Sequence, residues 1–199
     1  MKTIRLVIVA VGGQGNLLAS KVLGEAALHG NVPVRMSEIH GMAQRGGVVA
    51  SDMLFGDGKS TIIPDGYADV LLSFEPLEAL RALNRCNAGT TVITNLASIV
   101  PVTATIGKGT YPDIDTIKQK ISESTARLIA FDAAAPAKQA GTIMSVNMVL
   151  VGALIQTEIV PIPADHVRQV IRTKTKKAFV DINLTAFELG FAIAADACQ

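Results

Sequence analysis

The first feature of the sequence that could do chemistry is a glycine-rich turn at the end of an apolar strand. Residues 4–11 are almost all β-branched or aliphatic, which is typical of a strand buried on both faces of a parallel sheet. After the turn, leucine, valine and alanine recur at helical spacing. A strand, a glycine turn and a helix in this order can hold an anion such as phosphate on the N–H groups that begin the helix. The turn, our candidate cofactor-binding site, consists of Gly12, Gly13, Gln14, Gly15 and Asn16.

Two other interpretations of this turn remain open. Gly13, Gly15 and Leu18 fit the dinucleotide-binding fingerprint loosely, although Leu18 is larger than the small third residue of that pattern. Glu38 lies near the end of the predicted second strand, where an acid would bind the ribose of NAD. Alternatively, the glycines serve only to pack the helix on the sheet.

A second pattern resembles the motif that binds magnesium and thiamine diphosphate. It consists of residues 56–58 (Gly-Asp-Gly) followed by Asn84. The competing interpretation is a hairpin turn, because Asp-Gly is a strong turn dipeptide between two β-rich runs. Asn84 would also fall at a helix end, so we expect a turn here.

A polar segment between two predicted strands is the third candidate site. A loop that contains His, Gln and Arg is a poor core element, because its polar groups need partners. The segment is either a solvated loop, or one in which Arg45 holds a carboxylate or phosphate while glycines allow close approach. Its candidate interface residues are His40, Gln44, Arg45, Gly46 and Gly47.

Strands and helices alternate along the rest of the chain. This alternation predicts an α/β fold, namely a three-layer, mostly parallel Rossmann-like sheet with helices on both faces, in a single domain over residues 1–199. Residues 142–156 are apolar almost all round, which predicts a helix buried on every side. Strands are expected at residues 3–11, 33–39, 48–55, 67–74, 90–94 and 126–131, and helices after the glycine turn and at about 75–83, 113–124, 142–156, 163–172 and 178–195.

Composition narrows the class of protein. The net charge of +1 gives no argument for binding nucleic acid or an anionic membrane surface. Cys86 and Cys198 lie far apart and form neither a metal-ligand pattern nor a disulfide framework, which favours a reducing cytoplasm. We expect no signal peptide, no membrane span, no metal site and no catalytic residue of the chain's own.

The polar segment and the glycine turn together resemble a known family. Residues 12–15, followed by residues 37–47, are similar to the gamma domain of 2-oxoacid:ferredoxin oxidoreductases. The resemblance covers nearly the whole chain, and residues 40–47 are its most specific part. Its further matches are residues 131–133 (Phe-Asp-Ala), Asn147, Gly152 with Ala153, and residues 183–190 (Asn-Leu-Thr-Ala-Phe-Glu-Leu-Gly).

The resemblance implies a division of labour between subunits. Thiamine diphosphate, magnesium and 4Fe–4S clusters would lie on a larger alpha subunit, while this chain would supply binding, orientation and enclosure. The implied reaction is oxidative decarboxylation of an arylpyruvate such as indolepyruvate to an aryl-acetyl-CoA, with coenzyme A as co-substrate and ferredoxin reduced by the complex. A hetero-oligomer is implied, with a homodimer as an option for the isolated chain. The alternative from a different class is a self-sufficient Rossmann-type nucleotide- or NAD-binding protein.

Overall fold

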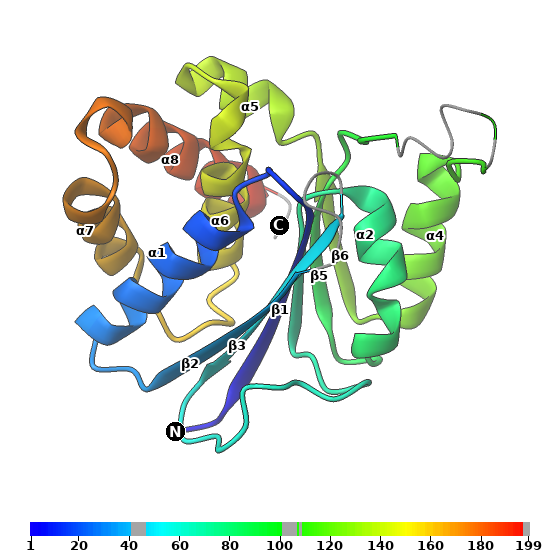
Figure 1. Cartoon of the computed structure of the whole chain (residues 1–199), viewed down its shortest axis with the longest axis horizontal. Coiled ribbons are helices and arrows are strands. Elements are labelled where there is room, and N and C mark those ends of the chain that lie inside the picture. Colours follow the sequence, from blue (N-terminus) through cyan, green and yellow to red (C-terminus); the bar gives the residue numbers. More distant parts are fainter. Residues whose placement is uncertain (41–46, 101–106, 108, 197–199) are drawn as a thin grey trace.

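In the computed structural model, which describes residues 1–40, 47–100, 107 and 109–196, helices flank both sides of one sheet (Figure 1). The strands are β1 (Ile4–Val11), β2 (Val34–His40), β3 (Val48–Phe55), β4 (Val70–Ser73), β5 (Thr91–Asn95) and β6 (Arg127–Phe131). The α-helices are α1 (Asn16–His29), α2 (Pro76–Arg81), α4 (Ile114–Ser124), α5 (Ala134–Ala140), α6 (Val146–Gln156), α7 (Ala164–Lys174) and α8 (Val180–Asp196). Short 3-10 turns occur at η1 (Leu83–Arg85), η2 (Ile143–Ser145) and η3 (Lys177–Phe179).

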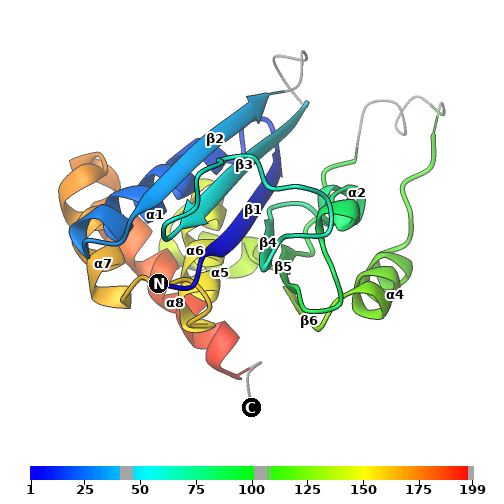
Figure 2. The same ribbon diagram turned by 90° about the horizontal axis from the view of Figure 1, so that it is seen from below.

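The strands of the described residues form a six-stranded sheet in the order β2-β3-β1-β4-β5-β6. β1, β4, β5 and β6 pair in parallel, whereas β3 runs antiparallel to both β1 and β2. Figure 2 shows β2, β3 and β1 side by side at one end of the sheet. The prediction of a mostly parallel sheet with the first strand in its interior is therefore confirmed.

The prediction that residues 56–58 form a hairpin turn between two paired strands is wrong. β3 ends at Phe55, and the next strand, β4, lies on the far side of β1, so the chain crosses the end of β1 before it re-enters the sheet. The buried carboxylate of Asp52 on β3 holds this crossing. Its Oδ2 accepts from the N–H of Ile63 at 2.9 Å and from Nη2 of Arg85 at 2.7 Å. A hairpin between β3 and β4 is excluded because β2 and β1 already occupy the two sides of β3.

The two faces of the sheet carry separate apolar cores, because successive side chains on β1 point to opposite faces. Leu6 and Ile8 belong to the core beneath α1, α6, α7 and α8. Val7 and Val9 belong to the core beneath α2 and α4. In Figure 1 these two groups of helices lie on opposite sides of the sheet, which confirms the predicted three layers.

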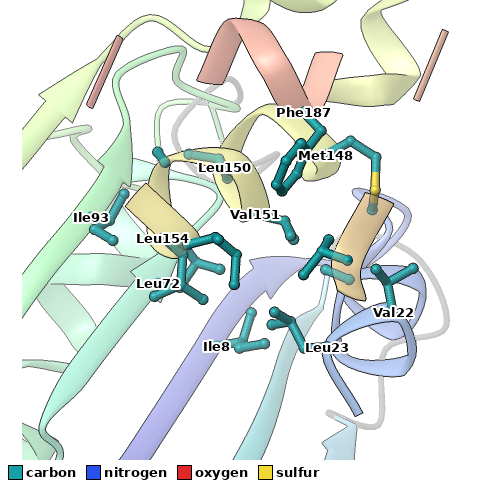
Figure 3. Packing of buried hydrophobic residues seen from close by; sticks show 14 of the residues in the cluster. Ile8, Val22, Leu23, Leu72, Ile93, Met148, Leu150, Val151, Leu154 and Phe187 are labelled. Atoms are coloured by element: carbon teal, nitrogen blue, oxygen red, sulfur yellow. The ribbon is translucent and has the colours of Figure 1, made fainter. Parts of the chain in front are cut away.

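The helix predicted at residues 142–156 is the centre of the larger core. It begins with η2 and continues as α6, in which every residue from Val146 to Ile155 is buried. Figure 3 shows Leu150, Val151 and Leu154 of α6 among side chains of the sheet, α1 and α8. The prediction of a helix buried on every side is confirmed for residues 146–155, whereas Ile143 and Met144 at the start of the predicted stretch are exposed.

Two glycines allow α6 and α8 to cross at close range. A Cβ atom added to Gly152 would overlap the carbonyl oxygen of Phe187, and one added to Gly190 would overlap the carbonyl oxygen of Val149. The main chains of the two helices therefore touch at this crossing, which leaves room for neither side chain. Both glycines belong to the sequence pattern that carries the family resemblance.

The stretch Lys177–Asp196 is long and apolar enough to span a membrane, by length and composition alone. A second candidate arises only if Ala134–Ala140 and Ile143–Gln156 are joined, and these are bent by 119°. Core helices of soluble proteins meet the same criterion, and α8 packs on α6 through its glycine crossing. Only 28% of the most apolar part of Lys177–Asp196 is buried by this chain, however, so many of its side chains remain at least partly exposed.

Candidate functional site

The glycine turn lies at the carboxyl edge of the sheet and begins α1. Gly13 and Gly15 have φ angles of 99° and 85°, in the left-handed region that favours glycine. Gly15 also touches α6, because an added Cβ would overlap Nδ2 of Asn147, and that amide donates to the Gly15 carbonyl at 3.3 Å. The turn is therefore held in one conformation by its own dihedral angles and by a helix more than a hundred residues away along the chain.

The two amide side chains of the turn make hydrogen bonds within the protein. Gln14 accepts from the N–H of Val11 at 2.7 Å through Oε1 and donates to the carbonyl of Phe74 at 3.0 Å through Nε2. Asn16 is buried and donates from Nδ2 to Oγ of Ser51 at 2.9 Å. Neither amide is therefore free to reach a ligand.

The main-chain N–H groups of the turn are the part that a ligand could use. The N–H of Gly12 donates to the carbonyl of Gly47 at 2.8 Å, and that of Gln14 donates to Val11 at 3.2 Å. Within the part of the chain that the structure describes, the N–H groups of Gly13, Gly15 and Asn16 have no acceptor. Three unsatisfied donors at a helix start form a favourable place for an anion.

Asn95, the last residue of β5, lies at the same edge of the sheet as the glycine turn and was not predicted from the sequence. Its Nδ2 donates at 3.1 Å to the same Phe74 carbonyl that Gln14 uses, and its Oδ1 accepts from the N–H groups of Ala97 and Ala133. Gln14, Phe74 and Asn95 thus tie together the segments that follow β1, β4, β5 and β6. A lone asparagine at the end of a buried β-rich run was the available signal.

A cavity of about 680 Å³ opens above this edge. Its floor includes the glycine turn and Asn95, and its sides come from the segment after β5, from η2 with the start of α6, and from the connection between α7 and α8. The walls are mostly apolar, and two lysines lie among them. The lining residues are Gly13, Gln14, Gly15, Leu18, Asn95, Ala97, Ser98, Ile99, Ala134, Thr142, Ile143, Met144, Ser145, Val146, Asn147, Lys174, Thr175, Lys176, Phe179 and Asn183.

Several side chains of this cavity are exposed although they are apolar. Met144 is 76% exposed, and Ile143, Phe179 and Ile99 are each more than 40% exposed. Lys174 makes a long contact of 3.7 Å with Glu25. The cavity thus combines anion-binding donors and positive charge with a large apolar surface, which suits a ligand that has both an anionic and an apolar part.

A carboxylate cluster fixes the segment that follows β5. Glu75 is 1% exposed, and its Oε1 accepts from the N–H of Ile99 at 3.1 Å and from the hydroxyl of Tyr111 at 2.5 Å. Burial, together with this hydrogen bond, raises the pKa of Tyr111. Burial also raises the pKa of Glu78, against the opposing charge of Arg81 at 2.7 Å. The cluster positions one wall of the cavity and does not face it.

The polar segment of the sequence analysis is only partly described. The side chain of His40 and residues 41–46, which include Gln44, Arg45 and Gly46, lie outside the described residues. Gly47 is described, and its carbonyl bonds the glycine turn through the N–H of Gly12. The end of the predicted partner-interface segment therefore adjoins the cavity floor, while its role at an interface stays a prediction.

Neither the dinucleotide-binding pattern nor the pattern for magnesium and thiamine diphosphate forms a site in the structure. Glu38 lies on β2, and β3 separates that strand from β1, so the acid is one strand further from the glycine turn than in a dinucleotide fold. It instead lies 3.5 Å from Oγ of Ser20. Asp57 follows the antiparallel strand β3 and therefore lies at the opposite edge of the sheet from the turn. Asn84 lies in η1, as expected for a helix end.

The described residues contain no group of three or more His, Cys, Asp or Glu side chains that could hold a metal ion. Cys86 is a buried free thiol. Burial raises the pKa of this thiol to about 11.

The chain belongs to the pyruvate ferredoxin/flavodoxin oxidoreductase family, whose sequence model matches residues 5–193. This result confirms the resemblance drawn from the glycine turn and the polar segment, and identifies the chain as an oxidoreductase subunit. Within the family it is similar to proteins named indolepyruvate oxidoreductase subunit IorB. The relative from Pyrococcus horikoshii is 45% identical over 98% of this chain and 97% of its own length. Those from Thermococcus kodakarensis and Archaeoglobus fulgidus are 44% and 39% identical over 98% and 94% of this chain, and 97% and 94% of their own lengths.

Solved structures share the fold at lower sequence identity. The gamma subunit of a keto/oxoacid ferredoxin oxidoreductase from Geobacter sulfurreducens superposes with a TM-score of 0.71 at 21% identity, over 97% of this chain and 99% of its own. The pyruvate oxidoreductase subunit PORC from Thermotoga maritima gives 0.73 at 20% identity, over 96% and 97%. The 2-oxoglutarate:ferredoxin oxidoreductase from Magnetococcus marinus also gives 0.73 at 20% identity, over 98% of this chain but 32% of its own. The fold is therefore that of a gamma subunit.

Proposed function

We propose that this chain is the subunit without redox cofactors of a 2-oxoacid:ferredoxin oxidoreductase that acts on indolepyruvate and other arylpyruvates. The reaction would release carbon dioxide, transfer the remaining acyl group to the thiol of coenzyme A and pass the electrons to ferredoxin. The observation that carries this proposal is the near full-length similarity, at 39–45% identity, to proteins named indolepyruvate oxidoreductase subunit IorB.

Thiamine diphosphate, magnesium and 4Fe–4S clusters would lie on a larger alpha subunit, with which ferredoxin would also exchange electrons. The work of this chain would be to bind, orient and enclose, because these cofactors supply the decarboxylation and electron-transfer chemistry. The apolar side chains around the cavity mouth support this role, since exposed apolar surface at a polar rim is typical of a protein–protein contact. The complex would work in the cytoplasm.

The cavity fits coenzyme A better than it fits a small 2-oxoacid. Its volume of about 680 Å³ lies within the range of pockets that enclose drug-sized ligands. The free N–H groups of Gly13, Gly15 and Asn16 would bind phosphate oxygens, and Lys176 would add positive charge nearby. Gly13 lines the cavity, and a Cβ atom added to it would meet no other atom within 4 Å, so a phosphate could approach the main chain closely. The apolar walls would pack against the pantetheine arm.

Co-expression of this chain with its candidate alpha subunit tests the proposal. We expect the two chains to purify together, with a brown colour and iron in the complex, and we expect the isolated chain to show no cofactor absorbance. Isothermal titration with coenzyme A should then show saturable binding to the complex. An isolated chain that binds NAD tightly and ignores the alpha subunit would instead support the nucleotide-binding alternative.

A further inference from the structure

One amide side chain of the cavity has no hydrogen-bond partner among the residues that the structure describes. Asn183 lies near the start of α8, lines the cavity and is 7% exposed. No hydrogen bond joins its side chain to any of the described residues. Asparagine carries two donors and an acceptor oxygen, and leaving these groups unbonded in a mostly buried position is unfavourable.

The other amides that line the cavity are all engaged. Gln14 and Asn95 bond the Phe74 carbonyl and neighbouring N–H groups. Asn147 donates to Gly15 and accepts from the N–H of Met148 at 2.9 Å. Among the described lining residues, Asn183 is thus the amide whose donor and acceptor are both available to a ligand.

The surroundings of Asn183 define what it could recognise. Phe179, one helical turn before Asn183, and Met144 of η2 line the same cavity and contribute apolar surface to it. In such surroundings a carboxamide matches a ligand amide, since each group offers one donor and one acceptor to the other. Such a contact discriminates strongly, because a site built for hydrogen bonds rejects ligands that leave its polar groups unpaired.

We propose that Asn183 is a specificity-determining residue that pairs with an amide of the pantetheine arm of coenzyme A. This inference rests on the proposed function, in which the phosphates lie at the glycine turn. It divides the cavity into an anion end, built from the N–H groups of Gly13, Gly15 and Asn16, and an amide end at α8.

The experiment compares two ligands on the complete complex. Coenzyme A carries the pantetheine amides, whereas adenosine 3′,5′-bisphosphate has only the nucleotide and phosphate end. Replacing Asn183 with leucine keeps the branching of the side chain at Cγ and removes both hydrogen-bonding groups. Asn183→Leu should weaken coenzyme A binding about ten- to hundredfold and leave adenosine 3′,5′-bisphosphate binding unchanged. Thr185→Ala, at an exposed position on the same helix, is the matched control and should bind both ligands as the wild type does.

The outcomes separate this inference from the proposed function. Equal loss of both ligands in Asn183→Leu would mean that Asn183 acts only through the fold and would overturn the inference. Unchanged binding of coenzyme A would overturn it as well. If Asn183→Leu does not fold, Asn183→Asp serves instead, because it keeps the size and loses the donor; selective weakening of coenzyme A is again the expected result. Failure of the wild-type complex to bind coenzyme A would refute the coenzyme A site and this inference with it, even if the two subunits assemble.

Discussion

The glycine crossing of α6 and α8 predicts opposite effects for the same substitution at two helical glycines. In Gly152→Ala, the new methyl group would overlap the Phe187 carbonyl oxygen and lie 2.9 Å from the main-chain nitrogen of Phe191, well inside the 3.4 Å at which ordinary contact begins. In Gly24→Ala on α1, the nearest atom is the terminal methyl group of Met53 at 3.9 Å, which is an ordinary contact. The second glycine can therefore be replaced without strain.

The magnitudes follow from these contacts. To admit a methyl group at Gly152, the helices must separate by roughly 1 Å, which strains a crossing that is buried on all sides and costs about 3–5 kcal/mol. The better helix propensity of alanine returns about 1 kcal/mol, so the net loss in the free energy of unfolding is about 2–4 kcal/mol. In Gly24→Ala only the helix propensity changes, so the free energy of unfolding should rise by about 0.5–1 kcal/mol.

Urea unfolding of the isolated chain, followed by circular dichroism, measures both changes against the wild type. The slope of the transition should stay the same, so that the midpoints report stability. Equal changes at Gly152 and Gly24, or a neutral Gly152→Ala variant with the wild-type fold, would refute the claim that α6 and α8 touch through their main chains.

Three other perturbations test separate parts of the account. Arg45→Ala should leave the isolated chain folded but weaken assembly or turnover of the complex about 30-fold or more, because a guanidinium contact to an anion is lost. Gel filtration with the alpha subunit measures assembly, and ferredoxin reduction measures turnover. Wild-type values in both measurements would show that Arg45 is only a surface residue. Asp52→Ala should lower the free energy of unfolding by about 3–5 kcal/mol, since it leaves Arg85 without its buried partner, and a loss below 1 kcal/mol in urea unfolding would contradict this. Because the pKa of Cys86 is raised from 9.0 to about 11, the folded state holds the thiol proton more tightly than the unfolded state, so stability should fall as pH rises from about 9 to 11. Cys86→Ala should remove this component of the alkaline slope in unfolding measured at several pH values.

The sequence predicted those parts of the fold that local pattern determines. Strand β3 has the predicted bounds, and α6 is buried as its all-round apolarity requires. The strand predicted at residues 67–74 is shorter, because the N–H of Ala68 donates to Arg85 in η1 instead of a neighbouring strand. The reversed direction of β3 was not predicted, since side-chain periodicity is the same in parallel and antiparallel strands.

Only part of the candidate site was predicted, because only part of it is determined by local sequence pattern. The glycine turn is a local signal, and it does form part of the cavity. Asn95 and Asn183 are isolated amides in β5 and α8, and only the folded chain brings them to the same cavity as the glycine turn. Asn183 carried a signal only as part of the family resemblance, which gives no role for its side chain. The use of Gln14 to bridge β1 and β4 likewise depends on strands about 60 residues apart.

The central claim is that this chain is an essential, non-redox subunit of a coenzyme A-dependent 2-oxoacid oxidoreductase. Its most direct test is ferredoxin reduction by indolepyruvate with purified alpha subunit, measured with and without this chain and with and without coenzyme A. The account predicts turnover only when both subunits and coenzyme A are present, with formation of the aryl-acetyl-CoA. Equal turnover by the alpha subunit alone, or no turnover of any 2-oxoacid by an assembled and cofactor-loaded complex, would contradict it.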